Sequence, residues 1–255
     1  MKGIILMNDN AQLKSHLKTL KLSGVLENLD IRLLEAQQNS LAYSEFLAGI
    51  LLDEIEIRNN RKLKQLLVQS KIGSVKTIEN FDFSFNHSIN AVQIRELATC
   101  RFIERGENIF FLGPTGTGKT HLAKAICHQA CRKYLTVRFY SFHQFFNDFI
   151  QADMNNQLPK IIKNLAKVDL LVIDDFAFKK ISQQAAEYLY AIVDGRYMIK
   201  SIILTSNRAI ADWGAIFPDP VIANAIMDRL AHNAHQIKIK GESYRKKFAP
   251  KFENA

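Results

Sequence analysis

The sequence has few cysteines and lacks any long hydrophobic run. Only 3 cysteines occur in 255 residues, Cys100, Cys127 and Cys131, so any disulfide scheme leaves one thiol unpaired. Cys127 and Cys131 have helical i, i+4 spacing, but no second pair at zinc-site spacing accompanies them, which favours buried thiols over a metal site. Apolar runs such as residues 4–7 and 170–173 are too short for a membrane span or a signal-peptide core. We therefore expect a cytoplasmic protein with no membrane partner.

Acidic residues are also in deficit, with 25 Asp and Glu against 34 Lys and Arg and a formal net charge of +9. Residues 1–90 are nearly balanced, at 11 basic against 10 acidic, whereas residues 91–255 hold 23 against 15. Such an excess suggests a polyanionic partner, most simply nucleic acid. For each of the two basic clusters, an ordinary solvated face is as good an explanation as a contact with nucleic acid. The clusters are Arg58, Arg61, Lys62, Lys64 and Lys71, and then Lys238, Lys240, Arg245, Lys246, Lys247 and Lys251.

Proline is absent and glycine scarce between residues 10 and 70, where leucines and other apolar residues recur at helical spacing. This pattern predicts a small helical N-terminal domain over residues 1–72, followed by a connector over residues 73–90. Residues 81–85 of the connector alternate like an extended strand or a docking strip. We expect Phe81, Phe83 and Phe85 to pack on the next domain rather than to touch a ligand.

Beyond residue 91, strand-like and helix-like segments alternate. Strands are expected at residues 109–112, 137–140, 169–174, 201–205 and 236–239, and helices near 117–134, 141–152, 182–197 and 219–232. The alternation predicts an α/β domain over residues 91–255, with a largely parallel sheet flanked by helices.

A glycine-rich loop, Gly-Pro-Thr-Gly-Thr-Gly-Lys-Thr at residues 113–120, lies between an apolar strand and an amphipathic helix. In such a loop backbone N–H groups converge on phosphate oxygens, the lysine reaches the β- and γ-phosphates, and the threonine hydroxyl ligates Mg²⁺. No Asn-Lys-x-Asp guanine signature occurs, which favours ATP. The expected nucleotide-binding residues are Gly113, Pro114, Thr115, Gly116, Thr117, Gly118, Lys119, Thr120 and the adjoining His121.

Polar residues follow two of the predicted strands. Asp174 ends a buried strand and is expected to bind the metal together with Thr120. Asp175 is placed to orient or deprotonate the attacking water, a role more often filled by the longer glutamate. Asn207 follows the next strand, where its amide can hold a water beside the γ-phosphate. Asp175 and Asn207 are therefore predicted to be catalytic residues, as is Lys119.

Two arginines occur late in the chain, Arg229 in a predicted helix and Arg245 after the last strand. An arginine at the γ-phosphate neutralises charge that develops in the transition state, and one supplied by a neighbouring subunit makes hydrolysis depend on assembly. On chemistry alone, either arginine is more often a surface ion-pair residue.

Together these residues resemble the IstB-like transposition helper ATPases of insertion sequences, which are relatives of the helicase loader DnaC in the AAA+ class. The motifs that carry the resemblance are residues 79–83 (Glu-Asn-Phe-Asp-Phe), 108–122, 168–176, 204–208 (Leu-Thr-Ser-Asn-Arg), 228–230 (Asp-Arg-Leu) and 241–245 (Gly-Glu-Ser-Tyr-Arg).

The resemblance implies an AAA+ fold with a five-stranded parallel sheet and a short C-terminal lid. It assigns Lys119 and Thr120 to Walker A, Asp174 and Asp175 to Walker B, and Asn207 to sensor I. By the same resemblance Arg229 is the trans-acting arginine finger and Arg245, which joins the nucleotide-binding residues, is sensor II. It also implies a ring or helical oligomer that assembles through the ATP site on duplex DNA, selects the target and activates a transposase.

One departure is Ala177, since the family usually has glycine after Asp-Asp-Phe. The alternative function is a DnaC-like loader for a replicative helicase. A metabolic P-loop kinase fits the asparagine and the late arginines poorly. A nucleotide-gated scaffold that does not hydrolyse ATP stays open because Asp175 replaces glutamate.

Overall fold

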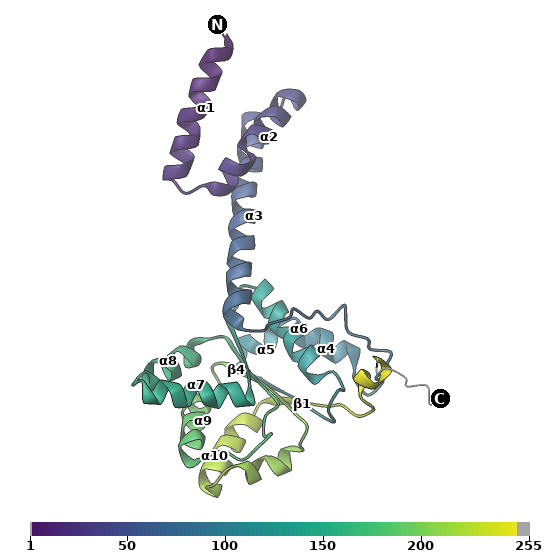
Figure 1. The fold of residues 1–255 in the computed structure, drawn as a ribbon. Coiled ribbons are helices and arrows are strands. Elements are labelled where there is room, and N and C mark those ends of the chain that lie inside the picture. The colour runs from purple at the N-terminus through teal and green to yellow at the C-terminus, as the bar shows by residue number, and fades with distance from the viewer. Residues whose placement is uncertain (1, 249–255) are drawn as a thin grey trace, which may run out of the picture. The chain divides into compact units, whose positions relative to one another are not determined.

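The computed structural model describes residues 2–248, and the chain divides between Gln65 and Leu66 into two compact units (Figure 1). The first unit contains α1 (Lys2–Thr19), α2 (Ser23–Asn39) and most of α3 (Tyr43–Ser70). The division falls within α3, because this helix continues past Gln65 into the second unit. The proposed functional division at residues 72 and 90 stays a prediction.

The helical unit is stabilised by a small apolar core and by buried carboxylates. Leu17, Val25, Leu29 and Ile50 form the core. Glu54 on α3 accepts hydrogen bonds from the free N–H groups of Gly24 and Val25 in the first turn of α2, at 2.6 and 3.2 Å. Asp53 binds Arg32 through both carboxylate oxygens, at 2.8 and 2.6 Å. The helices are thus held together by polar contacts as well as by leucines.

The second unit contains a parallel sheet of five strands in the order β2-β3-β4-β1-β5. The strands are β1 (Asn108–Leu112), β2 (Val137–Ser141), β3 (Leu170–Asp174), β4 (Ser201–Ser206) and β5 (Ala234–Lys238). Every residue of β1, β3 and β4 is buried, which explains why these strands read as continuous apolar runs. The predicted α/β class, parallel order and strand number are confirmed.

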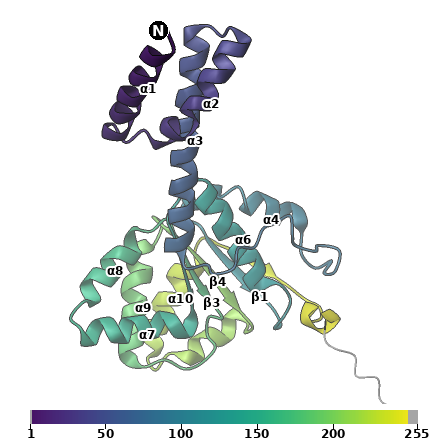
Figure 2. The ribbon, with the colours of Figure 1, turned by 45° about the horizontal axis from the view of Figure 1, so that its top comes forward.

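Helices cover both faces of the sheet (Figure 2). Helix α6 (Lys119–Arg132) packs across β1 to β4 on one face, and α4 (Ala91–Leu97) lies beside it in both views. The other face carries α7 (Phe142–Met154), α9 (Gln183–Arg196) and α10 (Pro220–Ala231), whose apolar side chains form one large core with Phe110, Leu171 and Leu204. The arrangement is the three-layer architecture that alternating strands and helices predict.

Several short elements were not predicted. They are α4 (Ala91–Leu97), α5 (Arg101–Glu104), α8 (Leu158–Lys167) and the 3₁₀ helices η1 (Ile210–Ile216) and η2 (Tyr244–Phe248). In α8, Leu158, Ile161, Ile162 and Leu165 have helical spacing, and Pro159 is tolerated because it lies in the first turn. The expectation of an extended strand at residues 81–85 is wrong. That segment forms turns, because the Asp82 carboxylate accepts hydrogen bonds from the N–H groups of Ser84 and Phe85.

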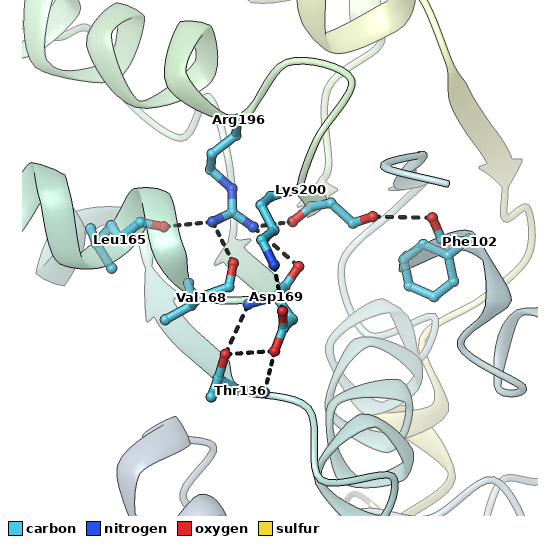
Figure 3. A network of polar contacts seen from close by, with 8 residues as sticks. Phe102, Thr136, Leu165, Val168, Asp169, Arg196 and Lys200 are labelled. Carbon is cyan, nitrogen blue, oxygen red and sulfur yellow. Dashed lines mark hydrogen bonds and ion pairs between the residues drawn. The ribbon is translucent and has the colours of Figure 1, made fainter. Parts of the chain in front are cut away.

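A buried arginine joins four elements at the amino-terminal edge of the sheet (Figure 3). Arg196, at the end of α9, donates hydrogen bonds to the carbonyls of Leu165, Val168, Asp169 and Ser201, at 2.5, 2.8, 3.4 and 2.6 Å. Burial lowers the pKa of Arg196 to about 9, which leaves the guanidinium charged at neutral pH. Beside it, Lys200 pairs with the Asp169 carboxylate at 2.6 Å. The network fixes the end of α9 against α8, β3 and β4.

Candidate functional site

The glycine-rich loop lies between β1 and α6, as predicted. Gly118 occupies the N-cap of α6 with φ +96°, and a Cβ there would lie 2.6 Å from the ring of Phe81. Glycine is therefore required at this position both by the backbone and by the close approach of the connector. The Lys119 ammonium donates to the carbonyls of Gly113 and Pro114, both at 2.7 Å. Burial lowers the pKa of Lys119, opposed by the charges of Asp175 and Asp174.

The hydroxyl of Thr120 joins the loop to the acidic strand. It lies 2.9 and 3.1 Å from the two carboxylate oxygens of Asp174 at the end of β3. Asp174 also accepts a 2.5 Å hydrogen bond from the hydroxyl of Thr205 on β4. Asp174 is 8 % exposed, and burial raises its pKa in spite of these hydrogen bonds. The structure thus brings together the two residues that the sequence predicts as metal ligands.

Asp175 lies beside this group but faces the cavity. Its backbone has φ +55°, and its N–H donates to Thr205 Oγ1 at 2.9 Å. Ala177, two residues on, has φ +64° and is fully buried. Glycine, which the resemblance implies at this position, adopts this conformation without a Cβ clash, whereas alanine is strained in it. Strained backbone of this kind gathers at functional sites because the surrounding fold maintains it.

Asn207 and Arg245 also reach the cavity. Asn207 directly follows β4, and Arg245 lies in η2 beyond β5. The N–H of Tyr244 donates to the Gly116 carbonyl at 3.0 Å, which places Arg245 next to the phosphate loop. The positive charge of Arg245 is one cause of the lowered pKa of Lys119. The C-terminal motif is therefore part of the same site as the loop, although about 125 residues separate them.

Arg229 is not brought to this cavity. It lies on α10, where its Nε donates to Asp194 on α9 at 3.0 Å and its guanidinium stacks 5.1 Å from the centre of the Tyr190 ring. It is absent from the residues that line the cavity. Among the predicted catalytic residues it is the one that the fold places elsewhere.

His121 lines the cavity from the first turn of α6. Its Nε2 lies 3.0 Å from the Thr77 carbonyl, and its ring meets Phe81 edge to face at 5.2 Å. Burial lowers the pKa of His121, so the neutral ring donates its Nε2–H to Thr77. His121 therefore attaches the connector to the helix that carries the phosphate loop.

The cavity has a volume of about 730 Å³, within the range of small-molecule sites. Residues from five segments line it: Val75, Lys76, Asn80, Phe81, Asp82, Phe85, Asn86, Thr115, Gly116, Thr117, Gly118, Lys119, Thr120, His121, Lys124, Asp175, Phe178, Asn207, Tyr244 and Arg245. Gly113, Pro114 and Asp174 do not line the cavity themselves. Gly113 and Pro114 accept hydrogen bonds from Lys119, and Asp174 accepts one from Thr120, and both donors line the cavity.

The connector contributes more to the site than the sequence predicts. Phe81 packs on His121 and Phe85 on Tyr244, as the sequence predicts, and both aromatic rings also line the cavity. Phe85 meets the Tyr244 ring edge to face at 4.8 Å, and Asn86 donates to the Lys240 carbonyl at 2.7 Å. Lys124, one turn after the loop, was also missed, although its position four residues after Thr120 on the same helix could have indicated it.

The two predicted basic groups differ in their surroundings. In the first, Arg58 pairs with Glu54, Arg61 with Glu27 and Lys71 with Asp148, so much of its charge is balanced. In the second, Lys238, Lys240 and Arg245 are exposed, and Lys251 lies outside the described residues. A further basic face that was not predicted lies on α8, where Lys160, Lys163 and Lys167 are exposed opposite the apolar side.

Three general expectations can be compared with the described part of the chain. Cys100, Cys127 and Cys131 are all buried as free thiols, and burial raises the pKa of each. Within residues 2–248, no three His, Cys, Asp or Glu side chains gather as they do in a metal site built from protein ligands alone. In the same range, none of the helices combines the length and the apolar character of a membrane span.

Comparisons with known proteins agree with this geometry. A family model described as IstB-like ATP binding protein matches residues 15–251. An ATP-binding protein named for insertion sequence IS21 of Pseudomonas aeruginosa is 38 % identical over 241 residues, covering 94 % of this chain and 90 % of the relative. An insertion-sequence ATP-binding protein of Mycobacterium tuberculosis is 36 % identical over 239 residues, covering 93 % and 95 %.

Two solved structures have a similar fold over much of the chain. The DnaC helicase loader aligns with a TM-score of 0.57 at 22 % identity, over 64 % of this chain and 96 % of DnaC. AMPPCP-bound DnaA from Aquifex aeolicus aligns with a TM-score of 0.58 at 23 % identity, over 70 % of this chain and 54 % of DnaA. At this identity the likeness is one of fold.

Proposed function

The chain belongs to the family of IstB-like ATP-binding proteins of insertion sequences, and from this membership we propose that it is an Mg²⁺-dependent ATPase that assembles on duplex DNA and activates a transposase. ATP binding, the AAA+ fold and the link to insertion-sequence transposition follow from the family. Hydrolysis, assembly, target selection and the partner are the proposed part.

The observation that carries the proposal is the contact between Thr120 and Asp174. A loop threonine 2.9 Å from a strand-end carboxylate joins the phosphate-binding element to the acidic strand. Asp175 and Asn207 line the same cavity on neighbouring strand ends, and Lys119 lines it from the loop. A binding site alone would need the loop, whereas hydrolysis also needs a metal, an ordered water and a polar group to hold it.

The residues present fit Mg²⁺. Thr120 and Asp174 supply the hard oxygen donors that this ion prefers, and a cation beside Asp174 would stabilise the charged form that burial disfavours. When bound, Mg²⁺ would neutralise phosphate charge and polarise the phosphoryl oxygens. Thr120 and Asp174 would hold it, directly or through water.

The chain's own groups then have distinct roles. The loop N–H groups and Lys119 would bind the phosphates, with Lys119 exchanging its carbonyl contacts for phosphate oxygens. Asp175 would accept a proton from the attacking water, and Asn207 would orient that water. Arg245 would supply positive charge from the same chain, and His121 would keep the connector against the loop.

Arg229 supports self-association. Its absence from the cavity of its own chain excludes a direct role there, so a role in hydrolysis requires the cavity of a neighbouring subunit. Such an arrangement places ATP between subunits and links assembly to occupancy. A ring and a helical filament both provide it, depending on whether the repeated contact closes.

DNA binding is supported by the net charge of +9 and by exposed lysines on α8 and near the C-terminus. Phosphate contacts of this kind release counterions, so affinity should fall steeply with salt. The replicative-helicase alternative rests on the DnaC fold, which says nothing about the partner. The insertion-sequence relatives favour a transposase.

The test combines ATP turnover with mixing of subunits. Lys119→Ala should abolish ATP binding, and Arg229→Ala should abolish hydrolysis while ATP binding remains. Mixing Arg229→Ala with Asp175→Asn subunits should restore turnover, because the second variant supplies an intact Arg229 to the first. Absence of recovery at every ratio would remove the intersubunit role.

The assembly is tested separately. Incubation of the full chain with duplex DNA and a slowly hydrolysed ATP analogue should give DNA-bound rings or filaments in electron micrographs. A salt-insensitive DNA affinity, or particles that stay monomeric with DNA and nucleotide, would contradict the proposal. Stimulation of a transposase encoded by the same type of element, but not of a replicative helicase, distinguishes the two candidate partners.

A further inference from the structure

Arg229 is held by α9 in a defined orientation. Its Nε donates to Asp194 Oδ1 at 3.0 Å, and its Nη2 donates to the Tyr190 hydroxyl at 3.3 Å. Nη1 donates to the Ala225 carbonyl at 3.1 Å. The guanidinium also lies over the Tyr190 ring, 5.1 Å from its centre. These contacts fix both the position and the plane of the group.

Helix α9 is itself a firm support. Tyr190 and Asp194 are four residues apart, so they lie on one face and meet α10 together. Arg196 projects from another face and binds carbonyls of α8, β3 and β4 (Figure 3). The end of α9 is attached to the sheet in this way. The contacts of Arg229 with α9 therefore also fix the position of Arg229 relative to the sheet.

The contacts leave part of the guanidinium available. Arginine has five N–H donors, and three are used by Asp194, Tyr190 and Ala225. Within the described part of the chain, one N–H on each terminal nitrogen remains for another acceptor. The Arg229 side chain is 26 % exposed, so part of it is accessible from outside the subunit. Each of these N–H groups can donate to an oxygen of a phosphoryl group.

We propose that Asp194 and Tyr190 are positioning residues that hold Arg229 ready for the nucleotide bound by a neighbouring subunit, an inference that rests on the proposed trans role of Arg229. Asp194 holds the guanidinium by an ion pair, and Tyr190 holds it by a cation–π contact and by a hydrogen bond to its hydroxyl. Because the side chain is already ordered, less conformational entropy is lost when the subunits meet.

A purely structural ion pair makes a different prediction. Asp194 is 52 % exposed, and exposed ion pairs contribute little to stability. Loss of the pair should then change the melting temperature slightly and turnover not at all. A positioning role instead predicts lower turnover with unchanged ATP affinity, because Arg229 does not line the cavity of its own chain.

The experiment measures kcat, KM for ATP and melting temperature of the full chain with duplex DNA, for Asp194→Asn, Asp194→Glu, Tyr190→Phe and Arg229→Ala. Glu107→Gln is the matched control, because it removes a carboxylate from another partly exposed pair, with His235 at 2.8 Å. We expect Asp194→Asn to lower kcat by about 10- to 100-fold at constant KM, as misplacement of a catalytic group does. Asp194→Glu should recover part of the loss, and Tyr190→Phe should lower kcat by about 2- to 5-fold, since it keeps the ring but loses a hydrogen bond. The control should stay at the parental rate.

Mixing then identifies the side of the interface. When Asp175→Asn subunits, which carry an intact Asp194, are added to Asp194→Asn, the ATP turnover of the mixture should exceed the sum of the turnovers of the two variants measured separately. Parental kcat in both Asp194→Asn and Tyr190→Phe, or a loss without recovery in the mixture, overturns the positioning role. If Arg229→Ala itself keeps the parental rate, the trans role in the proposed function fails, and this outcome is distinct from a failure of Asp194 alone.

Discussion

The hydroxyl of Thr205 on β4 donates a 2.5 Å hydrogen bond to the carboxylate of Asp174 at the end of β3. The same oxygen accepts a 2.9 Å hydrogen bond from the N–H of Asp175. One side chain on a neighbouring strand therefore orients both members of the acidic pair. Thr205 was not among the predicted site residues.

Replacing Thr205 by valine should lower ATP turnover by about 10- to 100-fold, because the acidic pair loses its shared orienting group. The variant should also lose about 1 to 3 kcal/mol of stability, since the Asp175 N–H is left without its partner. Thr205→Ser keeps the hydroxyl and should retain most of the turnover. Parental turnover in the valine variant would contradict the assignment.

Asp174→Asn should stabilise the protein while it abolishes hydrolysis. Burial raises the pKa of Asp174 above 3.8, so the folded state binds its proton more tightly than the unfolded state does. The destabilisation by its charge therefore develops as the pH rises from 3.8 through the folded pKa. We expect a gain of about 1 kcal/mol near neutral pH, or roughly 2–4 °C, and a smaller gain near pH 4. Urea unfolding of the metal-free protein at both pH values measures it, and a loss of stability near pH 7 would show that the charge is compensated.

Gly116→Ala should weaken ATP binding by at least about tenfold. Gly116 has φ +82°, and a Cβ there would lie against the hydroxyl of Ser243, 2.8 Å from its Cβ and 3.2 Å from its Cα. The clash would displace the Tyr244 contact and carry Arg245 away from the loop. Adding Ser243→Gly should recover part of the affinity, with a coupling of about 0.5 to 3 kcal/mol in a double-mutant cycle. Strict additivity of the two changes would contradict this contact.

Arg196→Met should destabilise the second unit by about 3 to 5 kcal/mol, because buried carbonyls lose a charged donor. At roughly 2–4 °C per kcal/mol, the melting temperature should fall by about 6 °C or more. The network lies at the amino-terminal ends of β3 and β4, away from the cavity, so ATP affinity should change little where the variant is folded. Lys200→Met is the matched control, since its pair with Asp169 is partly exposed and should cost about 1 kcal/mol or less.

Local signals in the sequence were enough for the class of fold and the centre of the site. Apolar runs in β1, β3 and β4 and helical spacing in α6 predict alternating strands and helices, because side-chain periodicity follows the backbone. The glycine loop and the strand-end aspartates predict phosphate and metal binding, because in a parallel sheet the carboxyl ends meet at one edge. The prediction of an extended strand at residues 81–85 was wrong because alternating phenylalanines are also compatible with turns. Here the turns are stabilised by Asp82.

The sequence by itself thus determined the α/β class, the phosphate loop and the acidic pair, since each depends on neighbours along the chain. Only the tertiary structure decided that Thr205 orients both aspartates, that Phe81 and Phe85 line the cavity, and that Tyr244 contacts Gly116. It also decided that Arg245 reaches the cavity whereas Arg229 is held by Asp194 away from it. These relationships join residues far apart in sequence, and their geometry arises from strand order and helix packing, which local patterns do not encode.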